Sequence, residues 1–177
     1  MKLLLHMCCA PCSVYPARVL QEEGVSFEGF FYNPNIHPRD EFIKRRENVE
    51  KFSLQKGIRV SYTDDFKQDV WENFKGSGDE RCRMCYSLRL DRAAAFSKEH
   101  GFDAFTTTLL VSPYQKHDLI KELGGKFAER YGVGFYYRDF RPGFRQGQQE
   151  AKEMGLYRQR FCGCILSYNE SKQRTGK

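Results

Sequence analysis

The seven cysteines of this chain form three short clusters, at residues 8–12, 82–85 and 162–164. The spacings are Cys-Cys-x-x-Cys, Cys-x-x-Cys and Cys-x-Cys, and about 70 residues of ordinary globular sequence separate one cluster from the next. Such spacings place thiolates within reach of one ion, so the chain must fold back on itself to bring the clusters together. Because thiolates are soft donors, they favour zinc, copper(I) or an iron–sulfur cluster over magnesium or calcium.

Seven thiols also exceed the four that one metal site needs. A purely structural zinc site would use four and leave no reactive sulfur beside it. An odd number of cysteines cannot pair completely into disulfides. The surplus of three therefore argues against a purely structural zinc site.

At 177 residues the chain is long enough for one compact domain, and no linker rich in Gly, Ser or Pro divides it. We therefore expect a single domain over residues 1–177. The apolar run at residues 3–7 is too short for a signal peptide, and no run approaches membrane-spanning length. These features predict a cytoplasmic protein with no membrane partner. In that reducing compartment, clustered cysteines are more often ligands or catalytic thiols than disulfides.

Short apolar runs alternate with amphipathic stretches along the chain, which predicts alternating strands and helices. The expected strands are 3–7, 27–32, 58–62, 104–110 and 134–138, and the expected helices are 13–23, 39–56, 66–74, 82–100, 115–131 and 146–154. This order is typical of an α/β, Rossmann-like fold: a parallel sheet of about five strands with helices on both faces. We expect this core to span about residues 1–140 and a C-terminal extension, about 141–177, to close over the metal site.

Several polar residues follow predicted strands, where parallel α/β sheets bind their ligands. The first cysteine cluster follows the first strand, Asn33 and Asn35 follow the second, and Asp139 follows the fifth. We therefore expect these residues to face one crevice. Asp139 fits a general acid or a metal ligand, although an Asp before Phe-Arg-Pro is also a common turn former.

Positive charge is concentrated in the last quarter of the chain. The net charge is +6, and residues 138–177 contain nine basic and four acidic residues, a local excess of five. Aromatic residues lie between these charges, as in surfaces that grip phosphates and stack on unpaired bases. A solvated basic tail over an aromatic core is the alternative. The nucleic-acid interpretation makes Arg141, Arg145, Tyr157 and Arg158 candidate substrate contacts, with Phe140 and Phe144 as further stacking candidates.

Two other functions compete with a metalloenzyme. Cys9-Ala-Pro-Cys12 follows a strand and opens a helix, as in a thiol–disulfide oxidoreductase, but a dithiol enzyme leaves the other two clusters unexplained. A zinc-bearing nucleic-acid-binding module explains four of the thiols. The sequence has neither G-x-G-x-x-G nor G-x-x-x-x-G-K-[ST], so conventional dinucleotide or NTP binding is unsupported.

Nearly the whole chain resembles the cobalamin-independent epoxyqueuosine reductases, the QueH family. The segments that carry the resemblance are HMCCAPC at 6–12, YNPNI at 32–36, RCRMCY at 81–86, TTLLVSPYQ at 107–115, and GLYRQ at 155–159 followed by Cys162-Gly163-Cys164. The resemblance implies reduction of epoxyqueuosine to queuosine at the wobble position of tRNAs with GUN anticodons, the last step of queuosine synthesis. It also implies an iron–sulfur enzyme without cobalamin and a HUP or PP-loop-like fold.

Under this resemblance all seven cysteines are candidate metal ligands. Reducing an epoxide to an alkene takes two electrons and two protons and releases water, so a low-potential electron donor is also implied. We expect a 4Fe-4S cluster on Cys9, Cys82, Cys85 and Cys164, which leaves Cys8, Cys12 and Cys162 for a second metal or catalysis. A surplus thiolate together with Asp139 could hold one mononuclear iron beside the cluster, so Cys8, Cys12 and Asp139 are the catalytic candidates.

Overall fold

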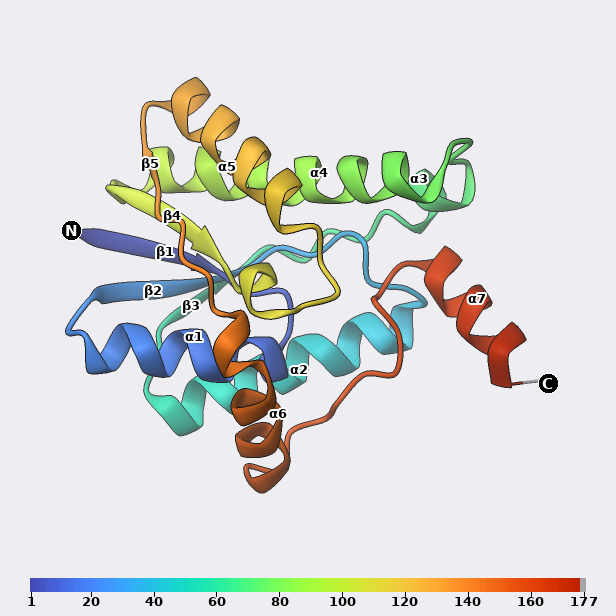
Figure 1. Cartoon of the computed structure of the whole chain (residues 1–177), viewed down its shortest axis with the longest axis horizontal. Helices are drawn as coiled ribbons and strands as arrows, with labels where there is room; N and C mark the ends of the chain where they lie inside the picture. Colours follow the sequence, from blue (N-terminus) through green and yellow to red (C-terminus); the bar gives the residue numbers. More distant parts are fainter. Residues whose placement is uncertain (176–177) are drawn as a thin grey trace.

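A computed structural model describes residues 1–175 and contains one sheet of five parallel strands (Figure 1). The strands are β1 Lys2–His6, β2 Ser26–Phe31, β3 Val60–Tyr62, β4 Ala104–Thr107 and β5 Gly134–Phe135. Their order across the sheet is β3-β2-β1-β4-β5. The chain therefore places β2 and β3 on one side of β1 and then crosses to the other side, where β4 and β5 lie. This arrangement confirms the predicted parallel α/β fold.

Helices cover both faces of the sheet (Figure 1). On one face lie α1 Ala10–Glu22, α2 Arg39–Lys56 and α6 Phe144–Glu153, and on the other α4 Gly78–Glu99 and α5 His117–Tyr131. The remaining elements are α3 Gln68–Glu72, the 3-10 turns η1 Thr108–Val111 and η2 Arg141–Gly143, and α7 Ile165–Thr175. Among residues 1–175, no helix combines the length and apolarity that a membrane crossing needs.

The strand side chains divide between the two faces as the twofold repeat of a strand dictates. Leu3 and Leu5 pack against α1 and α2, whereas Leu4 between them packs against α4 and α5. Phe30 and Phe31 divide in the same way. All five side chains are fully buried, which explains why these strands read as continuous apolar runs.

Most elements lie within a few residues of their predicted bounds, strand β5 ends three residues early, and two further differences have a clear local reason. Helix α4 begins at Gly78 rather than at Cys82, because Ser77 and Glu80 form a reciprocal capping box one turn earlier. Strand β4 ends at Thr107 rather than at residue 110, because the Thr107 hydroxyl accepts the Leu109 N–H and starts η1. The earlier start of α4 places Cys82 and Cys85 inside its first two turns, on one face.

The sequence prediction also missed helix α7, which lies at one end of the molecule, apart from the sheet (Figure 1). A small apolar cluster of Trp71, Cys85 and Cys164 joins α3, α4 and the start of α7. The ion pair between Arg81 and Glu170, 2.9 Å long, adds a second link between α4 and α7. The third cysteine cluster is thereby held beside the second.

The segment between α6 and α7 is fastened along helix α2. The Asn48 side chain donates to the Tyr157 carbonyl and accepts the Tyr157 N–H, at 2.8 and 3.0 Å. The Arg45 guanidinium donates to the carbonyls of Phe161 and Cys162, at 3.0 and 2.9 Å. It also pairs with Glu41 at 2.7 Å, and the Arg45 side chain is only 2 % exposed. Arg45 therefore fixes the backbone that presents the third cysteine cluster.

We predict that Arg45→Met lowers the free energy of unfolding by about 3–5 kcal/mol, because the change leaves a buried carboxylate without its cation. The matched control is Arg92→Met, which removes a partly exposed pair with Glu99 and should cost about 1 kcal/mol or less. Urea denaturation of the metal-free protein measures both. Equal midpoints for the two variants would contradict the anchoring role of Arg45.

Candidate metal and substrate site

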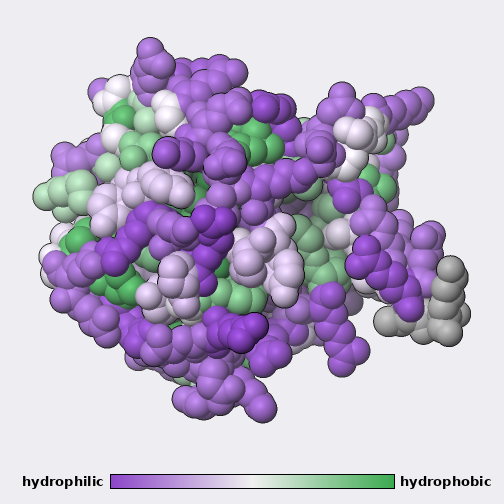
Figure 2. Space-filling view, viewed as in Figure 1, coloured by the Kyte–Doolittle hydropathy of each residue, from purple (hydrophilic) through white to green (hydrophobic). Residues whose placement is uncertain are grey.

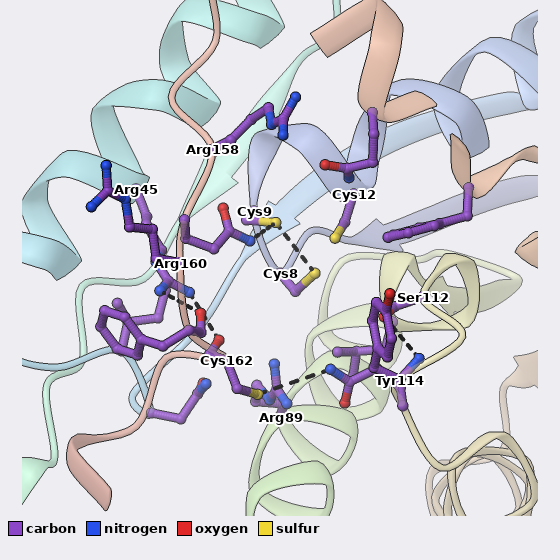
Figure 3. Close-up of a pocket in the computed structure, with 18 of the residues that line it drawn as sticks. Cys8, Cys9, Cys12, Arg45, Arg89, Ser112, Tyr114, Arg158, Arg160 and Cys162 are labelled. Carbon is purple, nitrogen blue, oxygen red and sulfur yellow. Dashed lines mark hydrogen bonds between the residues drawn. The ribbon is translucent and has the colours of Figure 1, made fainter. Parts of the chain in front are cut away.

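A cavity of about 790 Å³ lies at the carboxyl end of the sheet, beside the adjacent ends of β1 and β4. The chain changes direction across the sheet between these two strands, and such switch points are where open α/β sheets bind ligands. Figure 2 shows the surface hollowed beside α7, and Figure 3 shows the cavity wall. The residues that line it include Cys8, Cys9, Cys12, Asn35, Arg45, Arg89, Tyr114, Gln115, Phe144, Arg158, Gln159, Arg160, Cys162 and Arg174.

The β1 thiol group, Cys8, Cys9 and Cys12, lies at the floor of this cavity (Figure 3). Its sulfurs lie within 4.8 Å of one another, close enough to ligate one metal ion. Cys9 is the N-cap of α1 and Cys12 lies in its first turn, so the strand–helix junction itself gathers them. Thr108 fixes Cys8: its hydroxyl accepts the Cys8 N–H at 3.0 Å and donates to the Cys8 sulfur at 3.1 Å.

Within this group, the pKa values of Cys9 and Cys12 are shifted in opposite directions. The pKa of Cys9 lies well below its usual value, because the Cys12 and Cys8 thiols both donate to its sulfur. The pKa of Cys12 lies well above its usual value, since its thiol is held in hydrogen bonds with Cys8 and Cys9. Of the three, Cys9 is therefore the thiol that ionises most readily, and a thiolate is the form that a soft metal ion binds.

The other four cysteines form the α4 thiol group: Cys82, Cys85, Cys162 and Cys164. The pKa of Cys85 is raised to about 12, mainly by burial, with contributions from the nearby sulfurs of Cys162, Cys164 and Cys82 and against the opposing effect of Arg89. Burial also raises the pKa of Cys82, with Cys162 and Cys164 again contributing. The two helix thiols, Cys82 and Cys85, are therefore costly to ionise, and a bound cation relieves that cost.

A buried cation lies between the two thiol groups. Arg89 is 3 % exposed, lies four residues after Cys85 on the same helix face, and donates from Nη2 to the Cys85 sulfur at 3.2 Å. The sulfurs of Cys85, Cys8 and Cys162 each stabilise its positive charge. Figure 3 shows Arg89 beside Cys162. The site therefore favours an anionic sulfur-rich group, since hydrogen bonds to sulfur and nearby charge tune such clusters.

Two polar side chains on the cavity wall have unused acceptors. The Gln159 amide donates to the Cys9 sulfur at 2.9 Å, and its Oε1 is buried without a hydrogen-bond partner. Asn35 is 3 % exposed and its Oδ1 likewise has no partner. A buried acceptor without a partner is costly, so both atoms suit the N–H or O–H groups of a ligand. Gln159 was not among the sequence candidates, although it closes the GLYRQ motif.

The six substrate-binding candidates occupy different parts of the structure. Asn35 and Arg158 line the cavity, whereas Asn33 is fully buried and donates to the Met7 carbonyl at 2.9 Å. Tyr157 lies against α2, where its hydroxyl donates to Glu41 and Lys44 lies over its ring. The remaining two, Arg141 and Arg145, are exposed and lie outside the cavity wall. Of the stacking candidates, Phe140 is fully buried and Phe144 lines the cavity.

Asp139 lies outside the cavity wall, in an ion pair with Arg141. The guanidinium donates to both carboxylate oxygens, at 2.8 and 2.6 Å. These hydrogen bonds lower the pKa of Asp139 to about 2. The carboxylate is therefore ionised at neutral pH, a state that suits a metal ligand and not a proton donor.

A family model described as "Epoxyqueuosine reductase QueH" matches residues 3–170 of the chain. The epoxyqueuosine reductase QueH of Dehalococcoides mccartyi is 36 % identical, over 96 % of this chain and 93 % of the relative. That of Thermotoga maritima is also 36 % identical, over 97 % and 93 %. That of Haemophilus influenzae is 35 % identical, over 99 % and 76 %.

Solved structures with little sequence identity share the fold. The U34-tRNA thiolase NcsA from Methanococcus maripaludis, solved with its 4Fe-4S cluster, superposes with a TM-score of 0.58 at 12 % identity, over 99 % of this chain and 65 % of that one. A deacetylase of teicoplanin biosynthesis superposes with a TM-score of 0.56 at 9 % identity, over 87 % and 83 %. These likenesses confirm the expected PP-loop-like fold. The family model and the relatives in sequence match nearly the whole chain. The chain therefore belongs to the QueH family of epoxyqueuosine reductases and is an oxidoreductase.

Proposed function

We propose that this protein reduces the epoxide of epoxyqueuosine at the wobble position, 34, of tRNAs with GUN anticodons and so forms queuosine. The observation that carries the proposal is one cavity, in a member of this reductase family, whose wall holds the β1 thiol group and Cys162 of the α4 thiol group. The reaction adds two electrons and two protons, breaks both C–O bonds of the epoxide, forms a C=C bond and releases water.

The α4 thiol group fits a 4Fe-4S cluster, because it offers four cysteine sulfurs from two chain segments that fold together. The ligand set expected in the sequence analysis contained Cys9 and left out Cys162. We now favour Cys162, since the Cys9 sulfur lies with Cys8 and Cys12. The NcsA structure indicates that this fold accommodates such a cluster. When bound, the cluster supplies single electrons from a low-potential donor.

The β1 thiol group is then free for the chemistry at the epoxide. Three sulfurs within 4.8 Å of one another suit a second, mononuclear iron, which as a Lewis acid would polarise the epoxide oxygen. Cys8 and Cys12 remain the catalytic candidates, with Thr108 orienting Cys8. Asp139 joins them as a ligand only if Arg141 releases it, because the two side chains are paired.

The cavity wall supplies contacts to both parts of the substrate. We propose that Asn35 and Gln159 accept hydrogen bonds from the modified nucleoside, since their buried oxygens lack partners. Arg158, Arg160 and Arg174 line the same cavity, are exposed, and suit the phosphates of the anticodon loop. Tyr157 and Asn33 instead position the segments that carry these contacts.

Neither alternative function accounts for the whole site. A zinc-bearing nucleic-acid-binding module leaves the β1 thiol group without a role, and a dithiol oxidoreductase built on Cys9 and Cys12 leaves the α4 thiol group without one. Membership of a reductase family favours the metalloenzyme over both.

We predict that anaerobically purified protein, supplied with dithionite and epoxyqueuosine-containing tRNA, yields a nucleoside lighter by one oxygen atom after digestion and mass spectrometry. Cys8→Ser should abolish this product while keeping the wild-type sulfide content and the iron of the cluster, with loss of the mononuclear iron alone, because Cys8 lies outside the α4 thiol group. Met84→Leu, on the same helix as two proposed ligands, is the matched control with normal turnover. Absence of the lighter nucleoside with wild-type protein would refute the reductase proposal.

We predict that Arg158→Ala and Arg160→Ala each weaken tRNA binding and reduce the slope of log Kd against log salt by about 1, because each phosphate contact releases a counterion. Arg92→Ala is the control, since Arg92 lies on α4 away from the cavity and pairs with Glu99. Fluorescence anisotropy at several salt concentrations measures the slopes. Slopes identical to that of the wild-type protein in both variants would place the phosphate-binding surface elsewhere.

A further inference from the structure

Tyr114 presents a large aromatic ring to solvent at the edge of the cavity. The exposed large apolar side chains among residues 1–175 are Met1, Ile43, Leu54, Tyr114 and Tyr137. Tyr114 is 83 % exposed, and of these five it is the one that lines the cavity. An exposed aromatic ring in the lining of a cavity is free to stack on a flat ligand group.

The backbone that carries Tyr114 is held on both sides. The Tyr114 N–H donates to the Ser112 hydroxyl at 3.3 Å, which closes the turn before the ring. The Lys116 N–H donates to the Tyr86 hydroxyl at 3.2 Å, and that hydroxyl donates to Gln115 at 2.5 Å. The turn that carries Tyr114 is therefore anchored, and it presents the exposed ring from a defined position.

Phe144 supports the Tyr114 ring from one side. The two centroids are 5.9 Å apart and the rings are nearly perpendicular, at 84°. Phe144 is half-buried at the start of α6 and lines the same cavity. An edge-to-face partner of this kind fixes the orientation of a ring and leaves a face of it open to a further aromatic group.

The surroundings of the ring indicate what that group is. Figure 3 shows Tyr114 across the cavity from Arg160, with Cys8 and Cys9 between them. The partnerless oxygens of Asn35 and Gln159 lie on the same wall as the sulfurs. A ligand that fits has a flat aromatic part at the mouth, a polar part that reaches the sulfurs, and anionic groups beside the arginines. A nucleotide turned out of an RNA loop has all three.

We infer that Tyr114 is the platform on which the wobble base of the anticodon loop stacks once it leaves the loop, so that its modified side chain reaches the β1 thiol group. The inference rests on the proposed function and names the residue that holds the substrate base. Stacking on an aromatic side chain offsets the cost of unstacking the base from its neighbours. Tyr114 thus acts in positioning and contributes no electrons or protons.

The test compares two anticodon stem-loop RNAs that differ only at position 34, one with guanosine and one with an abasic site. Binding to anaerobically purified, cluster-loaded protein is measured by fluorescence anisotropy for the wild type, Tyr114→Ala, Tyr114→Phe and Tyr137→Ala. Tyr137→Ala removes an exposed tyrosine that does not line the cavity. Iron and sulfide content and thermal unfolding are checked in all four proteins.

We expect Tyr114→Ala to weaken binding of the guanosine RNA at least tenfold and binding of the abasic RNA less than twofold. Tyr114→Phe and Tyr137→Ala should stay within threefold of the wild type on both RNAs. Equal weakening of both RNAs, or no weakening of either, overturns the platform role. Turnover of epoxyqueuosine tRNA by the wild-type protein separates this failure from failure of the proposed function: with turnover intact, the platform alone is wrong.

Discussion

The pairing of β1 with β4 is the constraint on which the rest of the site depends. His6 and Thr107 are register partners at the ends of these strands, so Cys8 and Thr108 emerge side by side although 100 residues separate them. The chain then leaves the two strands in opposite directions across the sheet, and the loops cannot fill the space between them. The cavity follows from this topology, and the β1 thiol group lies at its floor.

Two buried arginines connect the helices on the two faces of the sheet with the cavity. Arg45 on α2 and Arg89 on α4 come from opposite faces of the sheet, and both reach the cavity. A buried cation is tolerated only with compensating charge and hydrogen bonds. Arg45 has Glu41 and two carbonyls, whereas Arg89 has the sulfur and the carbonyl of Cys85. An anionic sulfur-rich group beside Arg89 would complete its compensation, so loading the site should also stabilise the fold.

Much of the fold follows from patterns in the sequence, and much of the site does not. The apolar run from Leu3 to Leu5 and the alternation of strands with helices predict a parallel sheet, because strands buried on both faces need continuous apolar side chains. Cysteine spacing predicts which thiols are local neighbours. The division into groups of three and four depends on how α4 meets the segment before α7, and no local spacing encodes that contact. Arg45 is equally hidden, as one of many charges on a charged helix.

The most direct test of the two-group account is anomalous diffraction at the iron and zinc absorption edges from crystals of anaerobically purified protein. We predict strong iron density bounded by the sulfurs of Cys82, Cys85, Cys162 and Cys164, and a separate iron peak at the β1 thiol group. Density at the zinc edge alone would contradict the account. So would an iron cluster that has the Cys9 sulfur, and not that of Cys162, as its fourth ligand.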